Sequence, residues 1–149
     1  MMALGRQKHW ATRAYHNFLL ERAKVPFAWG SNDCALFAAD GILANTGVDI
    51  AADFRGKYTD EAGALAAIKA ITGGTTVADA AAWCAQKHGL AELAHPLTAR
   101  RGDLVVFEGQ TGSLVAGLVH LNGSSLVSVG EAGLYQFSIR RVKRAWHYE

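Results

Sequence analysis

Apolar residues recur at helical spacing through the first half of the chain. Between residues 10 and 22 the aromatic and aliphatic side chains share one face, and charged side chains occupy the other. This pattern predicts an amphipathic helix. Pro26 ends any helical continuation, so residues 25–30 are expected to form a short extended arm that turns at Gly30.

A second helix is expected from about residue 34 to residue 45. The residues just before it, Ser31, Asn32 and Asp33, have short polar side chains that accept hydrogen bonds from the free N–H groups of a helix start. Gly47 is suited to ending this helix in a left-handed conformation. Because apolar residues cover most of its circumference, we expect it to be central.

Two more helices are predicted before the pattern changes. The third covers about residues 60–71 and ends at a glycine pair, Gly73 and Gly74. The fourth begins after Thr76, which forms a possible capping box with Asp79, and it ends near residue 89. A connecting loop is expected over residues 91–103.

Beyond Gly102 the periodicity becomes that of β-strands. The segments "DLVVFEG", "SLVAGLVHLNG", "SLVSVG" and "GLYQFSIRRV" are rich in Val, Leu and aromatic residues and are separated by Gly, Asn and Ser turns. Helices followed by a meander of strands predict an α+β fold with an antiparallel sheet. We expect one domain over residues 1–149, since half of the residues are hydrophobic and suffice for one core.

Charge and cysteine content narrow the classes of function. The net charge is +2, and the one basic cluster, at residues 140–144, is expected at a charged strand edge, so nucleic acid is not an expected partner. No apolar run reaches the roughly 20 residues that span a bilayer. Two cysteines in different helices do not make a disulfide framework. We therefore expect a soluble protein made in a reducing compartment, with no export signal and no membrane span.

Cys34 stands where a helix end favours a thiolate. The free N–H groups and the aligned peptide dipoles of a helix N-terminus stabilise an anion there, and the thiolate is the nucleophilic form of cysteine. An enzyme would also need a histidine within hydrogen-bond reach and a polar group to orient it. The alternative is a structural role, because free cysteine is among the residues most often buried.

Several segments resemble a known family. "PFAWGSNDCALFAAD" followed by "RGDLVVF" and a short glycine-bearing strand resembles the papain-like cell-wall peptidase fold of the NlpC type. More closely, "FAWGSNDCALFAAD", "ANTGVDIAADFRGKYTDEAGALAAI", "GEAGLYQF" and "RAWHY" look like a family of small phage and prophage proteins of that fold, found among tail genes. This closer resemblance covers nearly the whole chain.

The resemblance implies a papain-like NlpC topology and a set of site residues. The nucleophile would be Cys34, preceded by Trp29 and Asp33. In the active peptidases a histidine opens a strand of the form His-Val-Gly-Ile, and the matching stretch here begins with Val115, which cannot accept a proton. His120 is the candidate substitute base, but it is five residues further along, and this odd offset predicts that it faces the other side of the sheet.

Two other motifs have simple structural interpretations. Cys84 and His88 stand four residues apart on a predicted helix, but two ligands do not make a zinc site, so neither a metal nor a cofactor is expected. The tripeptide Arg101-Gly102-Asp103 immediately precedes a strand and is expected to be a turn that enters it.

The resemblance predicts a tail-associated phage or prophage protein. We expect a virion component near the tail tip, made in the host cytoplasm, with a role in structure or assembly. Its scaffold would be that of a peptidase whose catalytic histidine is replaced by Val115. The expected partners are other tail-tip proteins and possibly peptidoglycan. One alternative is an active cysteine peptidase or amidase that hydrolyses peptidoglycan stem peptides during genome delivery, with Cys34 as nucleophile. Another is a host-encoded cytoplasmic binding module.

Overall fold

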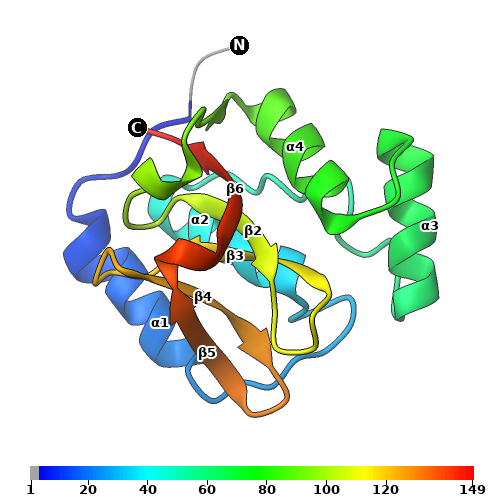
Figure 1. Cartoon of the computed structure of the whole chain (residues 1–149), viewed down its shortest axis with the longest axis horizontal. Coiled ribbons are helices and arrows are strands. Elements are labelled where there is room, and N and C mark those ends of the chain that lie inside the picture. The colour runs from blue at the N-terminus through cyan, green and yellow to red at the C-terminus, as the bar shows by residue number, and fades with distance from the viewer. Residues whose placement is uncertain (1–3) are drawn as a thin grey trace.

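A computed structural model describes residues 4–149 as a helical half followed by a sheet (Figure 1). Within these residues the fold is α+β, with four α-helices and one six-stranded antiparallel sheet. The helices are α1 (His16–Arg22), α2 (Cys34–Thr46), α3 (Glu61–Thr72) and α4 (Val77–His88). The strands are β1 (Ala91–Glu92), β2 (Leu104–Glu108), β3 (Leu114–Val119), β4 (Ser125–Gly130), β5 (Gly133–Ser138) and β6 (Val142–His147).

The helix boundaries follow the local signals in the sequence. The Asp33 side chain accepts a hydrogen bond from the Leu36 N–H at the start of α2, and Thr76 and Asp79 form the predicted capping box of α4. Helices α2, α3 and α4 each end at a glycine with φ near +80°, a left-handed conformation that suits residues without a Cβ. The first predicted helix differs, because Trp10–Tyr15 is π-helical and only α1 is α-helical.

The strand order is β1-β6-β2-β3-β4-β5. Two details differ from the expected meander. The predicted last strand is broken by a 3₁₀ turn at Ile139–Arg141, after which β6 crosses to pair with β2. In addition, the predicted loop after α4 contains β1, which pairs with β6.

The basic cluster near the C-terminus lies in the Ile139–Arg141 turn and on β6. β6 stands between β1 and β2 in the sheet, but β1 pairs only with Trp146 and His147, so Lys143 and Arg144 remain beside an uncovered edge, as expected. The Arg144 guanidinium donates two hydrogen bonds, of 2.9 and 2.8 Å, to the Glu92 carboxylate on β1. The pairing of β1 depends on a strand more than fifty residues later, which no local pattern reveals.

Two apolar clusters lie on the two faces of the sheet. Leu104 and Val106 of β2 pack against the helices, where α2 covers β3 and β4 and α4 covers β2 and β3. Val105 and Phe107 point the other way into a smaller cluster. This alternation is the period-two pattern of a strand that is buried on both faces. Because α2 covers β3 and β4, it is the central helix, as its apolar circumference predicted.

A buried ion pair fixes the N-terminal end of the described chain to the turn before β2, beside the C-terminal end. The Arg6 guanidinium donates to Asp103 Oδ1 at 2.6 Å and lies between the Trp10 and Tyr148 rings, 4.3 Å from each centroid. The Arg6 backbone N–H donates to the Glu149 carbonyl. Asp103 has no exposed surface, so the Arg101-Gly102-Asp103 turn leads into β2 as expected and presents no free carboxylate.

The helices in residues 4–149 are all too short, or too polar, to cross a lipid bilayer.

Candidate functional site

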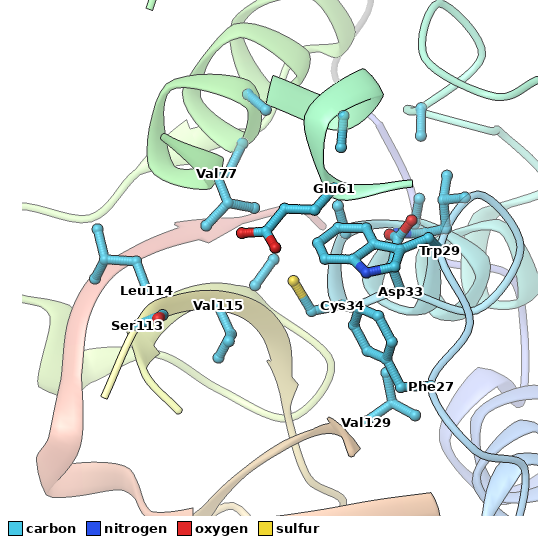
Figure 2. Close-up of a pocket in the computed structure, with 18 of the residues that line it drawn as sticks. Phe27, Trp29, Asp33, Cys34, Glu61, Val77, Ser113, Leu114, Val115 and Val129 are labelled. Carbon is cyan, nitrogen blue, oxygen red and sulfur yellow. The ribbon is translucent and has the colours of Figure 1, made fainter. Parts of the chain in front are cut away.

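A cavity of about 1180 Å³ opens beside the first turn of α2. Its walls come from α2, α3 and α4, from the loop before β3, and from the turn that joins β4 to β5. Cys34, Trp29 and Asp33, three of the residues predicted for the site, line this pocket together (Figure 2). The pocket is the candidate functional site.

Asp33 holds the turn that presents Cys34. Its carboxylate accepts hydrogen bonds from the Leu36 N–H at 3.0 Å, from the Gly30 N–H at 3.0 Å and from the Tyr58 hydroxyl at 2.7 Å. It is 1% exposed, so these donors replace its water. The lone pairs that a catalytic carboxylate would offer to a histidine are thus used to fasten the backbone around Cys34.

The turn before Asp33 requires glycine at residue 30. Gly30 has φ of +79°, and a Cβ there would clash with the carbonyl oxygen of Tyr58. The side chain of the neighbouring Asn32 donates to the carbonyls of Val25 and Pro26, which secures the extended arm against the turn. The geometry and hydrogen bonds of this turn therefore explain the glycine of Trp-Gly and the Asn-Asp pair that precedes Cys34.

An ion-pair network fixes the loop that carries Tyr58. Asp40 on α2 accepts from Arg22 at 2.7 Å and from Arg55 at 2.7 Å, and Arg55 also reaches Asp49 at 2.8 Å. These side chains are 12 to 34% exposed, so the network is only partly screened by water. The network holds the "DFRGKY" segment, residues 53–58, against α2. The Tyr58 hydroxyl then lies within hydrogen-bond distance of Asp33.

The Cys34 thiol is held in its protonated form. Its pKa is raised to about 11, chiefly by burial and also by the negative charge of Asp33, while the backbone N–H groups of Ala116, Ala35 and Cys34 itself act in the opposite direction. Desolvation therefore has the largest effect on the pKa of the Cys34 thiol. The start of the helix stabilises the thiolate, as predicted, but by less than burial destabilises it.

Strand β3 faces Cys34 with small and aliphatic residues. Leu114 and Ala116 pack on the helix side of the sheet, whereas Val115 borders the pocket from the other face, where it joins the cluster of Phe107. The resemblance placed Val115 where the active peptidases have histidine. In the structure Val115 lines the pocket, but it belongs to the apolar cluster on the face of the sheet away from the helices (Figure 2).

His120 lies away from Cys34. It follows the end of β3, four residues beyond Ala116, which is about 13 Å along an extended strand. Its ring Nδ1 accepts from the Asn122 N–H at 3.1 Å in the turn before β4, and burial lowers its pKa. Distance along the strand, rather than the face of the sheet, separates it from the thiol.

No other described histidine takes the place of the base. All six histidines of the chain fall within residues 4–149, and none of them lines the pocket. The His147 ring lies 2.7 Å from Asp103, in the turn before β2, and His88 is the last residue of α4.

Two residues of the site were not predicted from the sequence. Tyr58 ends the "DFRGKY" segment, and its hydrogen bond to Asp33 spans 25 positions. Glu61 opens α3 three residues later, and Figure 2 shows its carboxylate in the pocket that it lines. Their position at the end of this segment, or just after it, was the one signal that the sequence offered.

Cys84 also borders the pocket, from α4. It is buried, and burial raises its thiol pKa to about 12. Together with His88 it was weighed as a ligand pair. In residues 4–149 no three side chains of the metal-binding types come together, around this pair or elsewhere.

Comparison with known sequences gives a family and no curated relative. No curated protein matches the chain. A family model covers residues 5–148, which is nearly the whole chain and includes every pocket residue discussed above. The chain therefore belongs to the family described as a domain of unknown function (DUF6950).

Proposed function

We propose that this chain is a phage or prophage tail-associated protein on a papain-like NlpC scaffold, with a structural or assembly role and no hydrolysis at Cys34. The observation that carries the proposal is the set of residues around the thiol. Strand β3 presents Leu114, Val115 and Ala116 to the pocket, and no described lining residue is a histidine. A thiol without a proton acceptor is a poor nucleophile.

The arrangement of elements supports the scaffold. Cys34 occupies the first turn of the central helix, and that helix packs against an antiparallel sheet that follows it in the chain. The resemblance to NlpC-type proteins implies this order. A scaffold of this kind can keep its shape after its chemistry is lost, because packing and catalysis depend on different residues.

The electrostatics support the absence of hydrolysis. Burial and the Asp33 charge both disfavour the thiolate, and the pKa of Cys34 rises to about 11. The Asp33 carboxylate is occupied by three donors that belong to the scaffold. In this proposal the Asp33 carboxylate shapes the pocket and takes no part in catalysis. The expected partners are other tail-tip proteins of the virion.

A second candidate is the active peptidase or amidase. One feature favours it: the backbone N–H groups of Cys34, Ala35 and Ala116 act to lower the pKa of the thiol, as donors do around a developing negative charge. Its substrate would be peptidoglycan stem peptides. It would need a base from outside the residues that line the pocket.

Alkylation of Cys34 tests the protonation state. In a Cys84→Ala variant, iodoacetamide at pH 7.5 is expected to modify native Cys34 at least about tenfold more slowly than the unfolded chain, because a raised pKa leaves far less thiolate and the greater nucleophilicity of that thiolate offsets only part of the loss. The native rate should keep rising with pH up to about 11, where the unfolded chain has already levelled off. Mass spectrometry follows both rates, and a native rate equal to or above the unfolded one would contradict the proposal.

Cell-wall digestion tests the function. Purified peptidoglycan incubated with the protein is expected to release no soluble muropeptides, and Cys34→Ala should behave identically. Release by the wild-type chain alone would establish the active enzyme.

Mass spectrometry of purified virions from a producing strain tests whether the protein is a tail component. We expect peptides of this chain in the particle; their confinement to the lysate would count against a tail component.

A further inference from the structure

The charged side chains of the pocket are all acidic. Asp33, Glu61 and Glu131 line it, and among the described lining residues there is no Lys, Arg or His. This contrasts with the chain as a whole, which has 15 basic residues against 13 acidic ones. The basic side chains are thus placed elsewhere, and the pocket has a negative potential that favours a cation.

Two of these carboxylates have no partner in the fold. Asp33 is satisfied by its three donors, but neither Glu61 nor Glu131 forms an ion pair within residues 4–149. Glu61 is the first residue of α3, whose cap is supplied by Asp60, so the helix does not need its carboxylate. Its charge is therefore available to a ligand.

An exposed aromatic ring lines the same pocket. Trp29 is 39% exposed although it is large and apolar, and it packs edge-on against Phe27 with ring centroids 4.8 Å apart. In the view of Figure 2 the Trp29 indole and the Glu61 carboxylate both lie above Cys34, within the pocket that they line. A pocket that offers both a free carboxylate and an exposed indole suits an ammonium or guanidinium group.

The rest of the lining is mainly aliphatic. Val77, Leu114 and Leu65 contribute to it, and Leu65 is 48% exposed. The cavity volume of about 1180 Å³ exceeds the roughly 300–1,000 Å³ of common small-molecule sites. An occupant with several apolar side chains fits this surface better than one small polar group does.

We propose that the pocket binds a short segment of a partner protein in which a lysine or arginine is flanked by apolar residues, with the cationic group between Glu61 and the Trp29 ring. The inference rests on the proposed function, since it names the chemistry of the partner at the same site. A protein segment is favoured over a cell-wall stem peptide because the carboxylates of a stem peptide would be repelled by Glu61 and Glu131.

A matched pair of peptides tests the proposal. Acetyl-Ala-Leu-Lys-Leu-Ala-amide and its norleucine counterpart differ only in the ammonium group, and each is titrated into ¹⁵N-labelled protein while the amide shifts of the pocket residues are followed. The lysine peptide is expected to bind at least fivefold more tightly. Glu61→Gln should weaken the lysine peptide about fivefold, as for a partly exposed ion pair, and leave the norleucine peptide unchanged.

Two controls separate charge from folding. Glu21→Gln removes an exposed carboxylate of α1 that does not line the pocket, and it should leave both affinities unchanged. Glu61→Lys should exclude the lysine peptide and accept a peptide with glutamate at that position. Equal binding of the lysine and norleucine peptides, or no binding of either at millimolar concentration, would overturn the inference.

A third ligand distinguishes the competing source of a cation. If a stem tetrapeptide that contains diaminopimelate binds and the lysine peptide does not, the site recognises cell wall and not a protein segment. The outcomes are independent of the digestion test. Muropeptide release would end the proposed function while leaving the peptide affinities as measured, whereas failed binding would end this inference alone.

Discussion

Replacing Asp103 with alanine is expected to lower the free energy of unfolding by about 3–5 kcal/mol, the usual cost of breaking a buried ion pair on one side. Asp103 is fully buried, and the Arg6 side chain that it pairs with is 9% exposed. The substitution would leave a guanidinium between two aromatic rings without its counter-charge. It would also remove the acceptor of the Arg100 N–H, a 2.8 Å bond. Guanidinium chloride unfolding measures the change.

An exposed ion pair is the control. Arg144 donates two hydrogen bonds to Glu92, but these side chains are 38 and 45% exposed. Glu92→Ala should therefore cost less than about 1 kcal/mol. The double substitution Arg6→Met with Asp103→Leu should be more stable than Asp103→Ala, because it removes both charges together. Equally mild effects of Asp103→Ala and Glu92→Ala would contradict a special contribution of the buried pair.

Replacing Asp33 with alanine is expected to cost about 3 kcal/mol, since a helix cap contributes about 1 kcal/mol and two further, partly buried donors lose their acceptor. Those donors are the Gly30 N–H and the Tyr58 hydroxyl. Asp60→Ala is the matched control, because Asp60 caps α3 through the Gly63 N–H alone on an exposed surface. It should cost about 1 kcal/mol. Urea unfolding of both variants gives the comparison.

Asp33→Asn separates a structural carboxylate from a catalytic one. The asparagine keeps much of the cap but removes the negative charge that raises the pKa of Cys34. The alkylation rate of Cys34 at pH 7.5 should therefore increase, even though the fold is less stable. A carboxylate that activated the thiol would show the reverse, and a slower reaction of Asp33→Asn would contradict the structural role.

Local signals explain why the helical half could be predicted closely. A cap such as Asp33 or Thr76 and a stop such as Gly47 act within four residues, so the sequence contains all the partners. β1 and the break at Ile139–Arg141 depend on pairing across the sheet, and no local pattern contains that information. The π-helical Trp10–Tyr15 keeps an apolar face, so periodicity alone reads it as an ordinary helix.

The site was predictable in part for the same reason. Cys34, Asp33 and Trp29 are neighbours in the sequence and meet in one pocket. Tyr58 and Glu61 reach it from beyond a loop whose path is set by the Arg55 ion pairs, and only the tertiary structure shows this. The role of His120 stays a prediction that the geometry does not favour. Its position depends on which face of β3 meets α2, and alternation does not decide that.

The contact between Arg6 and Glu149 has a practical consequence for engineering. Because the two ends of the described chain are adjacent and neither lines the pocket, a short glycine-serine linker can join them without crossing the site. New ends can then be opened in the turn around Gly123, which joins β3 to β4 and does not line the pocket. A circular permutant of this kind should keep the fold, and the same adjacency suits the domain to insertion as a cassette into a surface loop of a carrier protein.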